Sequence, residues 1–301
     1  MYENFYGLSG KPFSLLPDAG FLYLSKRHKR VVNLLEYSAI TQAGFMVISG
    51  DVGAGKTTAL RHFLKHSGRD IVVGLITNSS KSLGRLFSWV ATAFDLNCSG
   101  MEDVEIYNHF VDFLLQQYAR GKRTVLIIDE AQNLTADMLE DLRMLSNVNN
   151  EKDQLLQIIL AGQPSLVNTL KHPELQQFVQ RISIHCHLTP LDPHETAGYI
   201  RHRLSVVGGS PALFDDKACA AVHFFTFGVP RLINLLCDQS MMYAFAEDKE
   251  SVDFQIIVEV VNDRNKGGLS AFRQVPVDMP ESDLLKELQD ILDKILASEA
   301  R

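Results

Sequence analysis

The chain has 301 residues, of which 46% are hydrophobic and 22% are charged, and its formal net charge is −7. These proportions are those of an ordinary soluble globular protein, so they exclude a disordered, collagen-like or disulfide-stapled chain, and the length predicts roughly two domains. The acidic balance argues against a globally basic nucleic-acid binder but leaves room for a local basic patch.

Up to Leu188 the chain alternates between strand-like and helix-like segments. Four apolar runs have the length and continuity of buried parallel strands, at 45–49, 71–76, 124–128 and 156–161. The stretches around them show helical spacing, from Arg27 up to Gly44 and at 56–66, 83–94, 103–118 and 136–145. Alternation of this kind predicts an α/β fold with a parallel sheet and helices on both faces.

After Leu188 the character of the chain changes. Helical segments follow with no strand-like run between them, at 193–207, 215–227, 230–246 and 253–263. They predict a small all-helical second domain. Residues 265–280 have the glycine and proline content of a linker. The alternating run Ile182–Leu188, which contains two histidines, indicates a strand with polar residues on one face rather than a metal site.

The last segment is an amphipathic helix, predicted over 283–297 from leucines and isoleucines that recur at spacings of three and four. Its apolar stripe is too short for a secure coiled-coil assignment, so docking onto its own chain, onto a partner or onto a second copy all stay open. The acidic character of the segment favours a protein partner over an anionic membrane.

The strongest chemical signal is the sequence GDVGAGKT at residues 50–57, which fits the phosphate-binding pattern G-x-x-x-x-G-K-[ST] between a predicted strand and a predicted helix. Glycines let successive backbone N–H groups converge on phosphate oxygens, and the helix start adds the positive end of its dipole. Lys56 is expected to reach the β- and γ-phosphates of ATP, and Thr57 to ligate Mg²⁺. The residues expected to contact the nucleotide are Gly50, Asp51, Val52, Gly53, Ala54, Gly55, Lys56, Thr57 and Thr58.

The second signal is a pair of carboxylates, Asp129 and Glu130, directly after the apolar run that ends at Ile128. Ligands bind at the carboxyl ends of parallel strands. Asp129 is therefore expected to hold Mg²⁺, and Glu130 to polarise the water that attacks the γ-phosphate.

Together these motifs carry a family resemblance. With IIDEAQNL, LLQIILAGQPSL, the QRI of FVQRI and GVPRLINLLCD, the chain looks like an AAA+ ATPase with a P-loop NTPase core. The opening YENFYGLSGKPFSLLPD, with FLYLSKRHKR, GDVGAGKTT and PRLINLLCD, is similar to the ExeA (GspA) family of bacterial secretion ATPases over roughly residues 1–262. Within that family the chain most resembles the shorter ATPases encoded with exosortase and exopolysaccharide loci. No segment of this sequence resembles the transmembrane helix or the periplasmic peptidoglycan-binding domain of ExeA itself, so direct binding to the cell wall is not expected.

The resemblance implies roles for three further residues. Gln163 would sense the γ-phosphate, with a turn residue before Pro164 as the alternative interpretation. Arg181 would be an arginine finger donated to the nucleotide of a neighbouring subunit, the alternative being a solvated arginine at a helix end. Arg231 would be the sensor-2 arginine, projecting from a lid helix onto the nucleotide of its own subunit.

The segment patterns and the resemblance together predict a domain organisation: an AAA+ α/β nucleotide-binding domain over residues 1–190, a helical lid over 191–264, a linker over 265–281 and the C-terminal helix over 282–301. The resemblance also implies a Mg²⁺-dependent ATPase that forms a homo-oligomeric ring or arc. Its turnover would drive assembly or regulation of an envelope system for secretion or exopolysaccharide, through a protein partner.

Three alternatives stay open. The first is a DNA-dependent ATPase of the transposition type, resembling TnsC, TniB or MuB, for which the basic residues at 26–30 would track phosphates. A solvated helix face explains these residues better, so a DNA partner is not favoured. The second is a slow ATP-switch adaptor, and the third, weakest, is a metabolic P-loop kinase.

Two features bear on location. The four cysteines form no C-x-x-C pair, which favours a reducing compartment and hence the cytoplasm. No apolar run approaches the roughly 18 residues that span a bilayer, so no direct membrane insertion is expected. A peripheral position at the inner membrane, through a partner, stays open.

Overall fold

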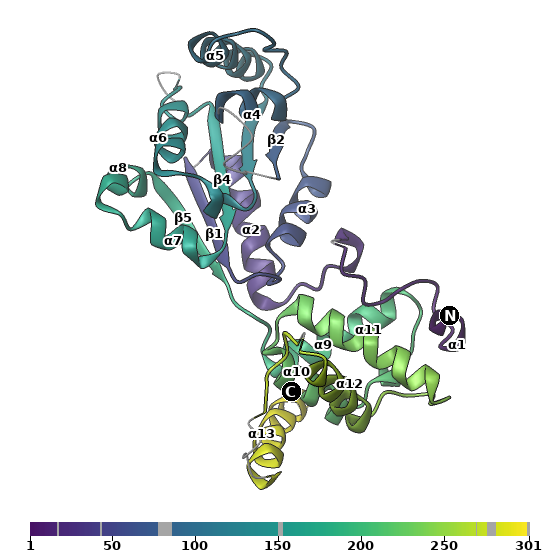
Figure 1. Ribbon diagram of the computed structural model, residues 1–301. Coiled ribbons are helices and arrows are strands. Elements are labelled where there is room, and N and C mark those ends of the chain that lie inside the picture. Colours follow the sequence, from purple (N-terminus) through teal and green to yellow (C-terminus); the bar gives the residue numbers. More distant parts are fainter. Residues whose placement is uncertain are drawn as a thin grey trace. The chain divides into compact units, whose positions relative to one another are not determined.

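The computed structural model describes residues 1–16, 18–42, 44–77, 86–149, 153–268, 270–275 and 281–299. Its contacts divide the chain into two compact units (Figure 1). The α/β unit comprises Lys26–Val52 and Lys56–Leu188, and the helical unit comprises Met1–Ser25, Gly53–Gly55 and Thr189–Arg301.

The α/β unit is built on one parallel sheet of five strands in the order β2-β3-β4-β1-β5. The strands are β1 (Phe45–Gly50), β2 (Ile71–Ile76), β3 (Arg123–Ile128), β4 (Leu156–Gly162) and β5 (Ile182–Leu188). All five strands expected from the sequence are confirmed, each to within one residue at either end. The predicted parallel α/β fold is confirmed with them.

Seven α-helices of the α/β unit lie within the described residues: α2 (Lys26–Thr41), α3 (Lys56–His66), α4 (Leu86–Ala93), α5 (Asp103–Ala119), α6 (Ala136–Leu145), α7 (Pro164–Leu170) and α8 (Gln176–Val179). The helix predicted over 83–94 is confirmed from Leu86, and residues 83–85 lie outside the described part of the chain. The sequence did not predict α7 and α8, because helices of seven and four residues are too short to display a 3.6-residue period.

Both faces of the sheet are buried, which explains why the central strands are continuous apolar runs. Phe45 and Val47 of β1 point to one face, where they join a hydrophobic cluster with side chains of α4 to α8, including Phe178. Met46 and Ile48 point to the opposite face and are also fully buried. Helices α2 and α3 pack against the sheet as well.

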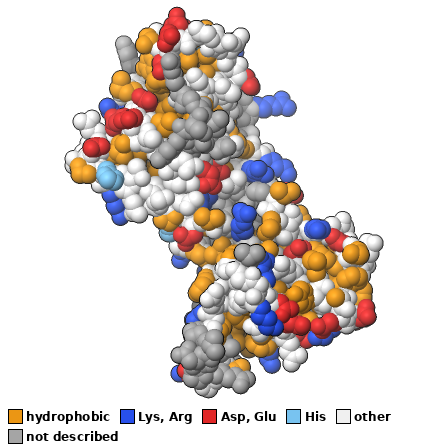
Figure 2. All heavy atoms as spheres, in the orientation of Figure 1, with side chains coloured by type: hydrophobic (Ala, Val, Ile, Leu, Met, Phe, Trp, Pro, Cys, Tyr) orange, Lys and Arg blue, Asp and Glu red, His pale blue; other side chains and the backbone are white. Residues whose placement is uncertain are grey.

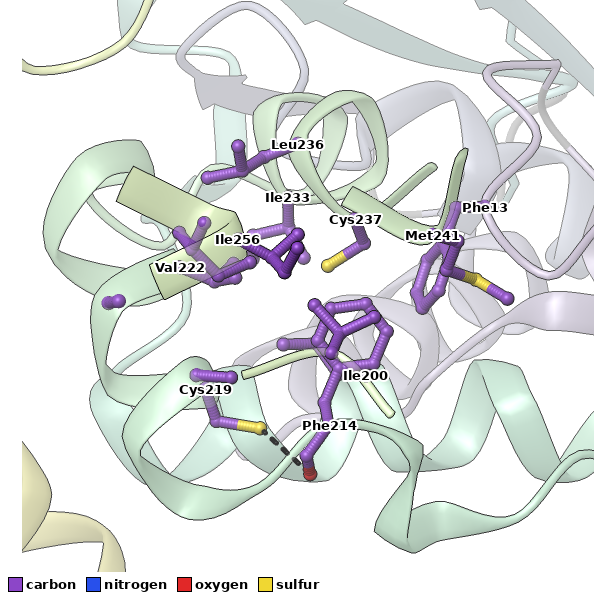
Figure 3. Packing of buried hydrophobic residues seen from close by; sticks show 14 of the residues in the cluster. Phe13, Ile200, Phe214, Cys219, Val222, Ile233, Leu236, Cys237, Met241 and Ile256 are labelled. Carbon is purple, nitrogen blue, oxygen red and sulfur yellow. Dashed lines mark hydrogen bonds between the residues drawn. The ribbon is translucent and has the colours of Figure 1, made fainter. Parts of the chain in front are cut away.

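The helical unit contains α1 (Tyr2–Phe5), α9 (Pro193–Val206), α10 (Asp216–Thr226), α11 (Pro230–Ala246), α12 (Phe254–Lys266) and α13 (Glu281–Glu299). Aspartates cap three of these helices: Asp192, Asp215 and Asp253 each accept a hydrogen bond from the backbone N–H three residues on, at 2.6–3.0 Å. Proline at the first position of α9 and α11 is compatible with a helix start. The helices enclose an apolar core around Phe214, Ile233 and Cys237 (Figure 3).

The C-terminal helix α13 packs on its own chain, against α9 and α10, with Leu288 and Ile295 buried. Part of the predicted linker also packs. Phe272 is buried, and Arg273 lies with its guanidinium 4.1 Å from the ring centre of Phe224 and pairs with Glu287 of α13 at 2.8 Å. Residues 269 and 276–280 of that linker lie outside the described residues.

On the face shown in Figure 2, basic, acidic and hydrophobic side chains are intermingled on each unit, and neither unit shows a large patch of one charge there. Among the helices that the structure describes, none combines the length and the apolar character needed to cross a membrane.

The first 25 residues belong to the helical unit by their contacts, although the sequence-based division assigns them to the α/β domain. Phe13 is buried in the helical core, and the N–H of Ser9 donates to the carbonyl oxygen of Val207 at 3.0 Å. Tyr2 donates its phenolic hydroxyl to Asp238.

A buried arginine fixes this N-terminal segment. Arg203 of α9 is 6% exposed, and its guanidinium donates to the carbonyl oxygens of Pro12 and Ser14 and to the hydroxyl of Tyr199. The guanidinium also lies 4.6 Å from the ring centre of Phe21. Hydrogen bonds from a charged donor are stronger than neutral ones, so this side chain is a principal anchor of the segment.

We therefore expect Arg203→Ala to loosen residues 1–16. Loss of the charged donors and the stem leaves the buried carbonyl group of Pro12 without its arginine donor, while the Ser14 carbonyl keeps a hydrogen bond from Asn234. The opening free energy of the segment should fall by roughly 3 kcal/mol. Amide hydrogen exchange at Ser9 should then become roughly 100-fold faster. Arg201→Ala is the matched control, because Arg201 on the same helix pairs with Asp216 in a partly exposed ion pair, which contributes at most about 1 kcal/mol. Equal exchange rates in the two variants would contradict the anchoring role.

Candidate functional site

The loop between β1 and α3 has the backbone that a phosphate-binding loop requires. Gly53 and Gly55 have φ values of 80° and 99°, which side chains other than glycine rarely allow. Gly50 pairs with Leu188 of β5, and a β-carbon at Gly50 would lie 2.5 Å from the carbonyl oxygen of Leu188. Glycine at these positions is thus dictated by conformation and by close approach of the backbone.

Lys56 is the first residue of α3 and is 6% exposed. Its Nζ donates to the carbonyl oxygens of Gly50 and Asp51, at 2.7 and 3.0 Å, so the amine folds back over the loop. Burial holds the pKa of Lys56 below its ordinary value, while the carboxylates of Glu130, Asp129 and Asp51 act in the opposite direction. A phosphate group entering the loop would add further negative charge beside this amine.

Thr57 and Asp129 lie in direct contact. The Thr57 hydroxyl donates to Oδ2 of Asp129 at 2.6 Å, and Asp129 is 5% exposed. A hydroxyl and a carboxylate oxygen are ligands of the kind Mg²⁺ takes, and that ion usually accepts only one or two protein ligands beside phosphate and water. The pair therefore fits Mg²⁺. Within the described residues, no group of three or more His, Cys, Asp or Glu is placed to hold a metal ion.

Glu130 follows Asp129 in the left-handed conformation, with φ 55° and ψ 36°. Its Oε2 accepts a hydrogen bond of 2.6 Å from Nε2 of Gln132. The amide oxygen of Gln132 in turn accepts the backbone N–H of Gln163 at 3.0 Å. The sequence predicted no role for Gln132, although this residue lies within the segment IIDEAQNL, two positions after Glu130.

Gln163 directly follows β4 and is the N-cap residue of α7. Because β4 lies between β3 and β1 and all three run parallel, their carboxyl ends meet at one edge of the sheet. The α/β unit thus brings Gly50, Lys56 and Thr57 together with the two carboxylates and Gln163 at this edge of its sheet.

Arg181 directly precedes β5 and therefore lies at the amino ends of the strands, opposite the carboxyl ends where Asp129 and Gln163 lie. Its carbonyl oxygen accepts the N–H of Phe45 at the start of β1, and its Nη1 donates to Oγ of Ser146 at 2.9 Å. Arg231 is the second residue of α11, in the helical unit. Because Arg181 lies at the amino end of β5, it is not near the phosphate loop and carboxylates at the carboxyl end of the same sheet.

The fold and the site define a P-loop protein of the AAA+ class. A family model described as an AAA domain matches residues 39–170. The chain is 37% identical over 253 residues to general secretion pathway protein A of Aeromonas hydrophila, an alignment that covers 84% of this chain and 46% of that protein. Over most of its length the chain is therefore similar to general secretion pathway protein A, on a fold of the P-loop NTPase (AAA+) class.

More distant similarities agree with the fold. The ATP-dependent target DNA activator B of Escherichia phage Mu is 28% identical over 130 residues, which is 43% of this chain and 39% of that protein. The chain thus spans less than half the length of the curated relatives it matches. The ORC2 protein of Aeropyrum pernix, solved as ADPNP–ADP complexes, has a TM-score of 0.58 at 14% identity and covers 90% of this chain and 94% of its own. The RuvB Holliday junction branch migration motor of Thermotoga maritima has a TM-score of 0.52 at 16% identity, covering 80% of this chain and 70% of its own.

The close approach at Gly50 gives a testable consequence. In Gly50→Ala the added methyl group meets the backbone oxygen of Leu188, which moves only if β5 moves, so we expect a loss of about 1–3 kcal/mol of stability. Thermal denaturation followed by circular dichroism measures it. Gly68→Ala is the control, because a β-carbon there has no neighbour within 4 Å. A melting temperature of Gly50→Ala equal to that of Gly68→Ala would contradict the steric account.

Proposed function

We propose that this protein is a Mg²⁺-dependent ATPase whose turnover drives conformational work on a protein partner in a secretion or exopolysaccharide envelope system. The observation that carries the proposal is the contact between Thr57 and Asp129, beside the buried amine of Lys56 and at the end of a glycine loop. The relationship to general secretion pathway protein A supports the choice of partner.

The residues of this edge have complementary tasks in hydrolysis. Backbone N–H groups of residues 50–58 and the Lys56 amine would hold the phosphates of ATP, and Thr57 and Asp129 would hold Mg²⁺. When bound, the ion would neutralise part of the phosphate charge. Glu130 would accept a proton from water as the water oxygen bonds to the γ-phosphorus and the bond to the β–γ bridging oxygen breaks, giving ADP and phosphate.

Three further residues, Gln163, Arg231 and Arg181, would contact the nucleotide from other segments of the chain or from a second subunit. Gln163, at the tip of β4, would contact the γ-phosphate, and Arg231 would reach the nucleotide from the helical lid. Arg181 is separated from the carboxyl edge by the length of β5, about 20 Å for its seven residues. That exceeds the reach of an arginine side chain, so its role as a finger requires a second copy of the chain in a ring or arc. An ATPase of this kind would act in the cytoplasm, where ATP is available, and a partner would bring it to the inner membrane.

A second candidate function is a DNA-dependent ATPase. The similarity to the target DNA activator of phage Mu favours it, as do four exposed basic side chains in the first turns of α2, Lys26, Arg27, Lys29 and Arg30. Contacts of this kind with DNA phosphates would be strongly salt-dependent.

ATP turnover measured against protein concentration, with Mg²⁺ and with or without duplex DNA, tests the proposal. We expect turnover per subunit to rise steeply with concentration, to be indifferent to DNA and to vanish in Lys56→Ala. Glu130→Gln should bind ATP as wild type does but lose at least about 100-fold in turnover, because the amide cannot accept the proton.

The other outcomes of that experiment discriminate between the candidate functions. Turnover that Glu130→Gln leaves unchanged removes Glu130 from the role of base. Stimulation by DNA that fades with salt favours the transposition-type ATPase. Hydrolysis too slow for mechanical work, with partner binding that depends on the nucleotide, points to an ATP-switch adaptor.

The role of Arg181 is tested by complementation. Arg181→Ala alone should lose roughly 1,000-fold in turnover if the finger contributes as arginine fingers do elsewhere. Mixed with Lys56→Ala, which keeps its finger but cannot bind the phosphates, it should regain activity. Arg143→Ala, which removes a neighbouring arginine paired with Glu140, should behave as wild type in the same assay. Absence of rescue in the mixture would exclude action between subunits.

A further inference from the structure

Gln132 joins two parts of the candidate site that are far apart in the sequence. Its amide group donates to Oε2 of Glu130 at 2.6 Å and accepts from the backbone N–H of Gln163 at 3.0 Å. Both hydrogen-bonding ends of one side chain are therefore engaged, one with the candidate base and the other with the loop that follows β4.

The local backbone holds Gln132 in this position. Glu130 is in the left-handed conformation and turns the chain into a 3-10 turn, Ala131–Asn133, closed by a hydrogen bond from Asn133 N–H to the carbonyl oxygen of Glu130 at 3.0 Å. Ala131 is fully buried against the sheet. The turn therefore presents Gln132 in one fixed direction.

Gly162 provides the space on the other side. A β-carbon at Gly162 would lie 2.9 Å from Cδ2 of Leu166, 3.0 Å from the amide oxygen of Gln132 and 3.2 Å from the backbone nitrogen of Gln132. A side chain at this position would therefore crowd both Leu166 and Gln132. Glycine as the last residue of β4 allows Gln132 to approach the end of the strand closely.

We propose that Gln132 is a positioning residue that fixes the carboxylate of Glu130 to the loop carrying Gln163, a role that rests on the proposed ATPase function. The hydrogen bond to a carboxylate is of the strong, charge-assisted kind and restricts rotation of the carboxyl group. A displacement of Gln163 when its side chain meets the γ-phosphate is transmitted through its N–H to Gln132 and from there to Glu130. Presence of the γ-phosphate and orientation of the base are thereby linked.

Two substitutions separate the two hydrogen bonds. Gln132→Met keeps the length of the side chain and removes both bonds. Gln132→Glu keeps an acceptor for the Gln163 N–H but replaces the donor to Glu130 with a second carboxylate. We expect both variants to lose roughly 10- to 100-fold in kcat, with KM for ATP within about threefold of wild type, because ATP binding does not use Gln132.

Asn133→Ser is the matched control, since it alters the neighbouring side chain of the same turn and should keep wild-type kcat. Melting temperatures of all variants show whether the fold is intact. A kcat of Gln132→Met within twofold of wild type overturns the positioning role, and so does a loss of kcat accompanied by an equal rise in KM. Wild-type turnover no higher than that of Lys56→Ala instead overturns the ATPase function on which the role rests.

A double-mutant cycle tests the link to Gln163. Gln163→Ala removes the side chain but leaves the backbone N–H that Gln132 accepts. If the γ-phosphate acts on Glu130 through Gln132, the loss of kcat in the double variant is smaller than the product of the two single losses. Losses that multiply would overturn the link.

Discussion

Parallel pairing of β1 with β4, and of β4 with β3, is the constraint on which the candidate site depends. It brings the ends of three strands to one edge, where Gly50 is the last residue of β1 and Asp129 and Gln163 directly follow β3 and β4. The hydrogen bond between Thr57 and Asp129 then joins residues that are 72 positions apart in the chain. A shift of one residue in either pairing would turn each side chain of the shifted strand to the opposite face. The fully buried apolar residues on both faces of β1, β3 and β4 make such a shift costly, so the sheet core also fixes the geometry of the site.

The helical unit depends on polar contacts as well as on its apolar core. Arg203 is a buried cation whose partners are carbonyl and hydroxyl oxygens, and such a group is tolerated only where its hydrogen bonds are made. Because two of these oxygens belong to Pro12 and Ser14, the arginine specifies where the N-terminal segment lies. At the other end of the chain, Arg273 fixes the segment before α13 in a similar way, through Glu287 and the ring of Phe224. Both terminal segments are therefore held by an arginine that combines a polar contact with an aromatic face.

Strands, long helices and motifs were predictable from the sequence because each follows from a regular spacing of residues. Contacts between segments far apart in the chain were not predictable. The strands and the long helices follow from continuous apolar runs or 3.6-residue spacing, and the phosphate loop and paired carboxylates from motifs whose spacing the chemistry requires. Gln132 carries no such pattern: its role appears only when Gly162 and Gln163 come alongside it. The same holds for residues 1–25, which precede the α/β segment in the sequence but contact helices about two hundred residues later. Arg203 makes this contact, and the helical periodicity of its segment does not distinguish it from other charged residues.

The charges at the site bear on which form of a nucleotide it would accept. Three carboxylates, those of Asp51, Asp129 and Glu130, act on the single amine of Lys56, and that amine is buried. A polyphosphate alone would bring several negative charges to a place where carboxylates already outnumber the cation, and repulsion at short range in a partly desolvated site is strong. Under the proposed function, a divalent ion held by Thr57 and Asp129 would offset the charge of Asp129 and of the phosphates at once. The proposal therefore predicts that the α/β unit prefers a polyphosphate that arrives with its Mg²⁺ over the free anion.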